Sequence, residues 1–129
     1  MDQMLSRWQP TALSLLRFII GLLLFQYGVA KIFKFPVLPY FANPPPLIMT
    51  AGAMELVLGA LLMVGLFTRP VAFILSGEMA FAYFMAHAPG GFWPLLNHGE
   101  AAVFYCFTFL YFAAAGGGAW ALDNMFRKR

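Results

Sequence analysis

Four long apolar stretches, separated by short polar or proline-rich breaks, dominate the pattern of hydrophobic positions along the chain. They cover residues of about 13–33, 47–67, 71–87 and 99–115. A membrane-crossing helix needs roughly 20 mostly apolar residues. Because lipid cannot form hydrogen bonds with backbone N–H and C=O groups, such runs are expected to be helical. The pattern therefore predicts an all-α membrane protein, a bundle of four transmembrane helices in one domain over residues 1–129.

The breaks between these stretches have clear chemical causes, because proline cannot continue a helix and glycine favours its end. Five prolines crowd residues 34–46, so this segment is expected to be a long loop. Thr68-Arg69-Pro70 suits a tight turn, with the proline in the first turn of the next helix. Residues 89–94 provide the third connection, and three glycines at 116–118 allow the last helix to stop.

Composition supports the membrane class and excludes others. The chain of 129 residues is 62% hydrophobic and only 10% charged, whereas soluble domains are about a quarter charged. One cysteine excludes an internal disulfide framework. A net charge of +3, without a large basic patch, gives no indication of nucleic-acid binding. The expected partners at this point are the lipid bilayer and a further copy of the chain.

Lysine and arginine outside the spans predict the orientation. With four spans, both termini and the second connection lie on the same side of the membrane. That side carries Arg7, Arg69 and the basic tail 127–129. We therefore expect a multi-pass protein of the cell inner (plasma) membrane, with both termini cytoplasmic and the proline-rich loop outside. The default partner of the tail is anionic lipid.

Charged residues inside the spans are the main candidates for a functional site, because a charge at membrane depth costs at least about 2.5–3.5 kcal/mol on insertion scales. With the 3.6-residue period, Arg17 and Lys31 share one face of the first helix with Gly21 and Gly28. Glu55 shares one face of the second helix with Gly52 and Gly59. Small residues let helices approach closely, so both faces also suit a packed seam. The charged residues are Arg17, Lys31, Glu55, Glu78 and Glu100.

The expected depths of these charges in the membrane allow several pairings. Arg17 is placed to meet Glu78, and Lys31 is placed to meet Glu100 or, by reaching inward past Tyr27, Glu55. One hypothesis makes Glu55 a protonatable centre of the bundle. The alternative is a structural ion pair between Lys31 and Glu55. These two residues are the candidates for any catalytic role.

A second polar group flanks the third break. His87, His98 and Glu100 are residue types that bind metals, and two histidines can ligate haem. On a helix, however, His87 points nearly opposite to Glu78, so we assign no metal site and expect interfacial histidines. Phe104, Phe107 and Tyr111 share the Glu100 face, and an aromatic cleft ending in a carboxylate suits a quinone headgroup, with plain aromatic packing as the alternative.

The ordered set of sequence pieces resembles the DoxX family of small four-helix membrane proteins. The pieces are LLRFIIGLLLFQYGVAKIF, GAMELVLGALLMVGLFTRP, GEMAFAYFMAHAPGGFWPLLN, HGEAAVFYCFTFLYFAAAG and GGGAWALD. His98 departs from the pattern, since similar sequences often carry another residue there. The positions that match are Arg17, Gly28, Lys31, Glu55, Gly59, Gly65, Arg69, His87, Glu100 and Asp123.

The resemblance implies a redox setting, because the family is associated with membrane subunits of thiosulfate:quinone oxidoreductase and with complexes that handle oxidative stress. The leading expectation is a subunit of a quinone- or sulfur-linked complex with a polar intramembrane pocket, and the resemblance implies a redox protein as its partner. Two other classes stay open, a transporter of small solutes or protons and a scaffold or assembly factor without catalysis. The predicted pocket residues are Arg17, Tyr27, Lys31, Glu55, Glu78, His87, Glu100 and Tyr111.

Overall fold

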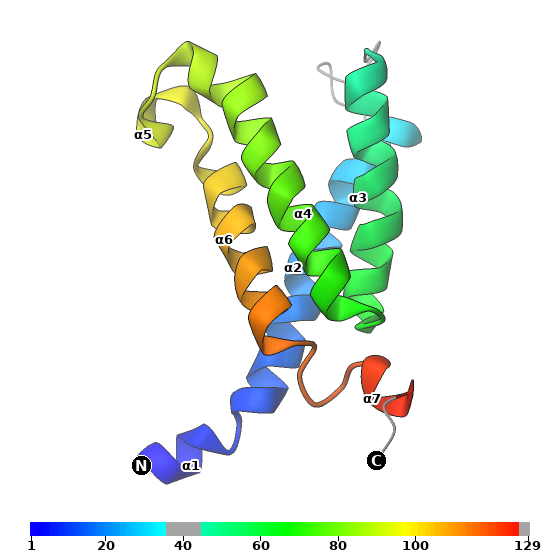
Figure 1. The fold of residues 1–129 in the computed structure, drawn as a ribbon, viewed down its shortest axis with the longest axis vertical. Helices are drawn as coiled ribbons and strands as arrows, with labels where there is room; N and C mark the ends of the chain where they lie inside the picture. The colour runs from blue at the N-terminus through cyan, green and yellow to red at the C-terminus, as the bar shows by residue number, and fades with distance from the viewer. Residues whose placement is uncertain (36–44, 127–129) are drawn as a thin grey trace. The chain divides into compact units, whose positions relative to one another are not determined.

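The computed structural model describes residues 1–35 and 45–126, and every regular element in these ranges is helical (Figure 1). The predictions for the proline-rich loop at 36–44 and the basic tail at 127–129 lie outside the described residues. The chain divides into two compact units, Met1–Thr68 with Gly117–Arg129, and Arg69–Gly116.

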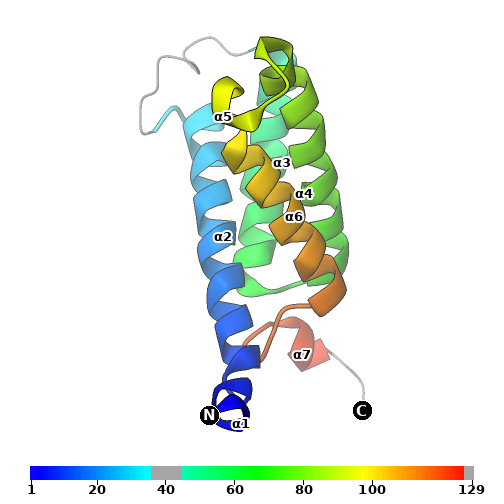
Figure 2. The same cartoon turned by 90° about the vertical axis from the view of Figure 1, so that its left-hand side faces the viewer.

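The first unit is built on two long helices, α2 (Gln9–Ile32) and α3 (Pro46–Val64), which run side by side in opposite directions (Figure 2). The short helix α1 (Asp2–Ser6) precedes them, and α7 (Asp123–Phe126) follows near the end of the chain. Helix α3 starts on the predicted proline boundary and ends at Gly65, whose left-handed conformation (φ 76°) stops the helix earlier than residue 67.

Glycines set the distance between α2 and α3. A Cβ added at Gly28 would lie 2.5 Å from the backbone nitrogen of Leu56, and one at Gly21 would lie 3.1 Å from the backbone nitrogen of Met63. On the facing helix, a Cβ at Gly59 would lie 3.2 Å from the backbone of Phe25. The helices therefore touch backbone to backbone, as small residues permit in membranes.

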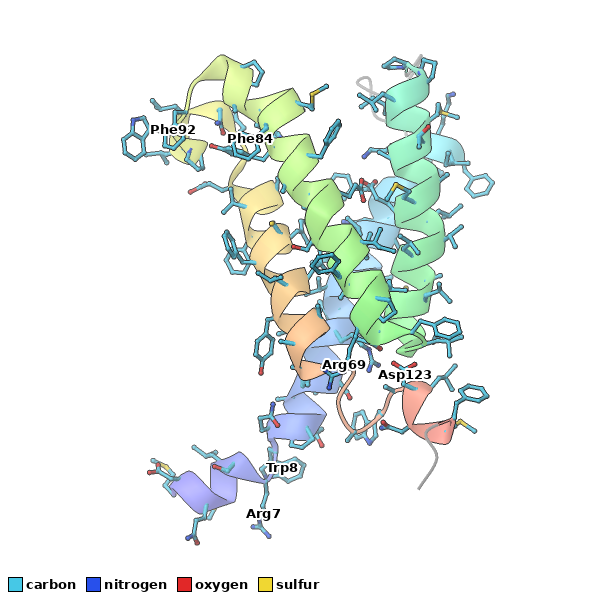
Figure 3. All side chains as sticks on the ribbon, in the orientation of Figure 1. Arg7, Trp8, Arg69, Phe84, Phe92 and Asp123 are labelled. Atoms are coloured by element: carbon cyan, nitrogen blue, oxygen red, sulfur yellow. The ribbon has the colours of Figure 1, made fainter. Side chains whose placement is uncertain are left out.

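The second unit is a helical hairpin. Its first arm is α4 (Thr68–Ala82), which continues through a π-helical turn, η2 (Tyr83–His87), and a 3₁₀ turn, η3 (Ala88–Gly90). The short α5 (Pro94–Asn97) leads into the return arm α6 (Glu100–Ala115). Arg69 joins the open ends of the arms, since its guanidinium donates to the carbonyl oxygens of Ala113 and Ala114 (Figure 3).

Three helical segments in the described residues are long and apolar enough to cross a membrane, namely Gln9–Ile32, Pro46–Val64 and Thr68–Gly90. Helix α6 is apolar but has only 16 residues. All four predicted apolar stretches are thus helical, and the last is shorter than the three segments that are long enough to cross a membrane.

Candidate intramembrane charge site

Lys31 and Glu55 form an ion pair between α2 and α3. The Nζ atom of Lys31 lies 2.9 Å from Oε1 and 3.0 Å from Oε2 of Glu55, so the ammonium group donates to both carboxylate oxygens. Only 12% of the Lys31 side chain and 3% of the Glu55 side chain are exposed. Of the pairings open from the sequence, the structure shows this one.

The direction of the two helices explains the pairing. Side chains on a helix lean toward its N-terminus, so Lys31 leans back along α2 and Glu55 leans along α3 toward Pro46. Because α2 and α3 run in opposite directions, the two side chains lean toward one another. Gly52 leaves room for this approach, since a Cβ added there would lie 2.7 Å from the Cβ of Lys31.

Tyr27 lies beside the ion pair, one turn before Lys31. The Nζ of Lys31 is 5.9 Å from the centre of the Tyr27 ring, within the range of a cation–π contact. Tyr27 is 39% exposed, in contrast to the nearly enclosed Glu55. The site therefore joins a buried charge pair to an aromatic ring on the surface of α2.

Arg17 lies on the same helix and bonds to backbone carbonyls. Its guanidinium donates to Gly117 and, at 3.4 Å, to Met63, and the residue is only 3% exposed. Ser14 donates to the same Gly117 oxygen at 3.0 Å and accepts from the backbone N–H of Trp120 at 2.9 Å. Arg17 thus fastens the glycine-rich segment after α6 to α2 and α3.

Asp123 has a role that the residue pattern alone did not indicate. Its Oδ1 and Oδ2 accept the backbone N–H groups of Phe67 and Thr68 at 2.6 and 2.9 Å, so it caps the start of α4 from the far end of the sequence (Figure 3). The backbone N–H groups of Leu122 and Asp123 also donate to Val64 and Gly65. The signal available in the sequence was the match of Asp123 to the family pattern.

The other predicted pocket residues belong to the second unit. Glu78 is partly buried on α4, whereas Glu100 and Tyr111 are exposed on α6. The predicted pairs Arg17–Glu78 and Lys31–Glu100 each join residues of different units, so they stay predictions. The structure brings together Lys31, Glu55 and Tyr27 from the predicted set.

The histidines lie near the loop end of the second unit. His87 ends the π-helical turn, and its Nδ1 lies 3.3 Å from the backbone oxygen of Asn97. His98 is exposed in a left-handed conformation (φ 61°). Within residues 1–35 and 45–126, no three side chains of histidine, cysteine, aspartate or glutamate gather in a group that could hold a metal ion.

These apolar helices define a helical membrane protein. The DoxX family pattern matches residues 12–88, and the chain belongs to this family. Over 131 residues the chain is 43% identical to an uncharacterized protein of Haemophilus influenzae, and the match covers 97% of this chain and 98% of that relative. No solved structure matches the chain.

Proposed function

We propose that this protein is a membrane subunit of a redox complex in the inner membrane, linked to a quinone or a sulfur compound. The observation that carries the proposal is the Lys31–Glu55 pair, two opposite charges enclosed between apolar spanning helices. Ionisable groups inside a membrane are costly, and they commonly mark functional sites. The redox class comes from the association of the DoxX family with thiosulfate:quinone oxidoreductase.

Tyr27 and the ion pair together suit a quinone headgroup. A quinone is a flat apolar ring with two polar oxygens, and it travels in the lipid beside the helices. In this proposal the ring packs against Tyr27, which is 39% exposed, while Lys31 donates a hydrogen bond to a quinone oxygen. Glu55 holds the ammonium group in place through its two bonds.

The proposed reaction needs a partner. Converting a quinone to a quinol takes two electrons and two protons. A partner protein that oxidises a reduced sulfur compound such as thiosulfate would deliver the electrons, and the two protons would come from the aqueous phase. The contribution of this chain would be to bind and orient the quinone and to shield it from water. Lys31 and Glu55 are its candidate ligand-binding residues.

We further propose four crossings with both termini in the cytoplasm. In the first unit, the backbone N–H of Ala119 donates to Pro10, and Asp123 accepts from Phe67 and Thr68. These bonds support placing the start of α2, the turn before α4 and the C-terminal segment on one side of the membrane. Arg7 precedes α2 and Arg69 follows that turn, as the positive-inside rule favours.

The proposal is tested with the full chain in its own membrane. The tagged protein is extracted in mild detergent, copurifying proteins are identified, and reduction of decylubiquinone by thiosulfate is followed in the purified sample. We expect a redox protein to copurify and the sample to reduce the quinone. Purification of the chain without such a protein, with an unchanged quinone reduction rate in membranes that lack the chain, would overturn the proposal.

A further inference from the structure

The connection between the two arms of the second unit is unusually apolar at its surface. Residues 91–99 read GFWPLLNHG and contain no acidic residue, lysine or arginine. Four large side chains are turned outward, with exposed fractions of 71% for Phe92, 65% for Trp93, 75% for Leu95 and 68% for Leu96. A cluster of this kind marks a surface that binds something apolar.

Apart from the exposed His98, the polar side chain of the same segment, Asn97, points inward and is paired. Asn97 is buried, and its Nδ2 donates to the oxygen of Gly91 at 2.7 Å and to the hydroxyl of Tyr83 at 3.1 Å. Its Oδ1 accepts the backbone N–H of Gly99 at 2.8 Å. The Tyr83 hydroxyl donates to the oxygen of Phe92. Non-helical backbone is tolerated at membrane depth where it is buried in protein, and Asn97 and Gly99, at the centre of these bonds, are both buried.

The lengths of the two arms place this segment at membrane depth. The outgoing arm, Thr68–Gly90, has 23 residues and a length of about 34 Å at 1.5 Å per residue. The return arm α6 has 16 residues and a length of about 24 Å, short of the roughly 30 Å of hydrocarbon. Because Arg69 joins the arms at their open ends, α6 begins about 10 Å short of the tip of the outgoing arm.

We propose that residues 91–99 form a hairpin that inserts into the lipid leaflet at the loop end of the second unit. Together with α6, this hairpin makes up the fourth crossing. Its partner is the acyl-chain region just below the lipid headgroups. The surface continues that of the spans beside it, where Phe84 is 65% and Phe104 is 74% exposed. Figure 3 shows Phe84 and Phe92 at this end of the unit. The inference rests on the proposed four crossings and is independent of any redox role.

Tryptophan fluorescence tests the proposal directly, because Trp93 lies in the hairpin. The variant Trp8→Phe/Trp120→Phe keeps only Trp93, and it is reconstituted in phosphatidylcholine vesicles with or without lipids brominated near the headgroup end of their acyl chains. We expect these lipids to quench Trp93 at least twofold, and aqueous iodide to leave its emission nearly unchanged. Quenching by iodide alone would show a water-exposed loop and overturn the proposal.

A second variant sets the scale for contact with lipid. Phe107 is 64% exposed in the middle of α6, so Phe107→Trp in a background with the three native tryptophans replaced by phenylalanine reports a lipid-facing position. Quenching of Trp93 within twofold of this reference, by lipids brominated at matching depth, supports insertion. Quenching of the reference while Trp93 responds to neither lipid nor iodide would mean that protein covers the hairpin, and this would also overturn the proposal.

Discussion

The Cβ atom of Lys31 packs against the backbone of Gly52, where an added Cβ would lie only 2.7 Å away. This contact brings α2 and α3 close enough for the ammonium group to reach both oxygens of Glu55, three residues beyond Gly52. The glycines and the charges are therefore parts of one arrangement, because the close approach of the helices sets the geometry of the ion pair.

The first prediction concerns this close approach. Gly28→Ala places a methyl group 2.5 Å from the backbone nitrogen of Leu56, so the helices must separate and the variant should unfold at a lower temperature in detergent. Gly77→Ala is the matched control, since no atom lies within 4 Å of an added Cβ there, and alanine is favoured over glycine in a helix by about 1 kcal/mol. Equal melting temperatures for the two variants would contradict a tight α2–α3 contact.

The second prediction concerns the balance of charge between Lys31 and Glu55. Removing one partner of a buried ion pair costs about 3–5 kcal/mol, while replacing both partners with neutral residues is often tolerated. Glu55→Gln and Lys31→Met should each destabilise the protein clearly, and the double variant should be more stable than either. Unfolding by denaturant in detergent measures the difference. Additive losses in the double variant would show that the two residues are not coupled.

The third prediction concerns the cap on α4. Asp123→Ala removes the acceptors for the N–H groups of Phe67 and Thr68, and loss of a helix cap costs about 0.5–2 kcal/mol. Asp123→Asn keeps one oxygen and should lose less. Thermal unfolding checks the order, and hydrogen exchange at Phe67 and Thr68 should be faster in the alanine variant. Unchanged exchange at both amides would argue against the cap.

The fourth prediction concerns the hairpin at residues 91–99. Asn97→Ala leaves the N–H of Gly99 and the oxygen of Gly91 without the partners that they have here, and each buried unsatisfied group costs about 1–3 kcal/mol. The neighbouring change His98→Gly should be tolerated, because His98 has a positive φ of 61° that glycine adopts readily. Limited proteolysis should cleave Asn97→Ala faster than His98→Gly, and similar rates would contradict the role of Asn97.

Much of the fold follows from the sequence because its signals are local. Continuous apolar runs predict helices, because a backbone that faces lipid must form its hydrogen bonds within its own segment. The prolines at 46 and 70 mark helix starts. The spacing of the glycines also indicated the contact face of α2 and α3. For Lys31, the sequence left two acidic partners open, and the antiparallel lean of the side chains favours Glu55.

The features that sequence reasoning missed depend on distant parts of the chain. Asp123 and Arg17 bind backbone groups rather than side chains, and backbone acceptors leave no residue pattern to detect. The interlocked bonds of Tyr83 and Asn97 likewise depend on the path of the loop. Neither periodicity nor charge spacing carries that information, so the carbonyl partners of Arg17 could not be predicted.

The neutral double variant Lys31→Met/Glu55→Gln tests the central claim most directly when its thiosulfate-dependent quinone reduction is measured in the assembled complex. Because a neutral pair is expected to fold and assemble, loss of turnover would reflect the missing charges rather than a missing protein. We predict normal assembly with quinone reduction lowered at least tenfold. Assembly with an unchanged rate would contradict it and would leave the ion pair with a purely structural role.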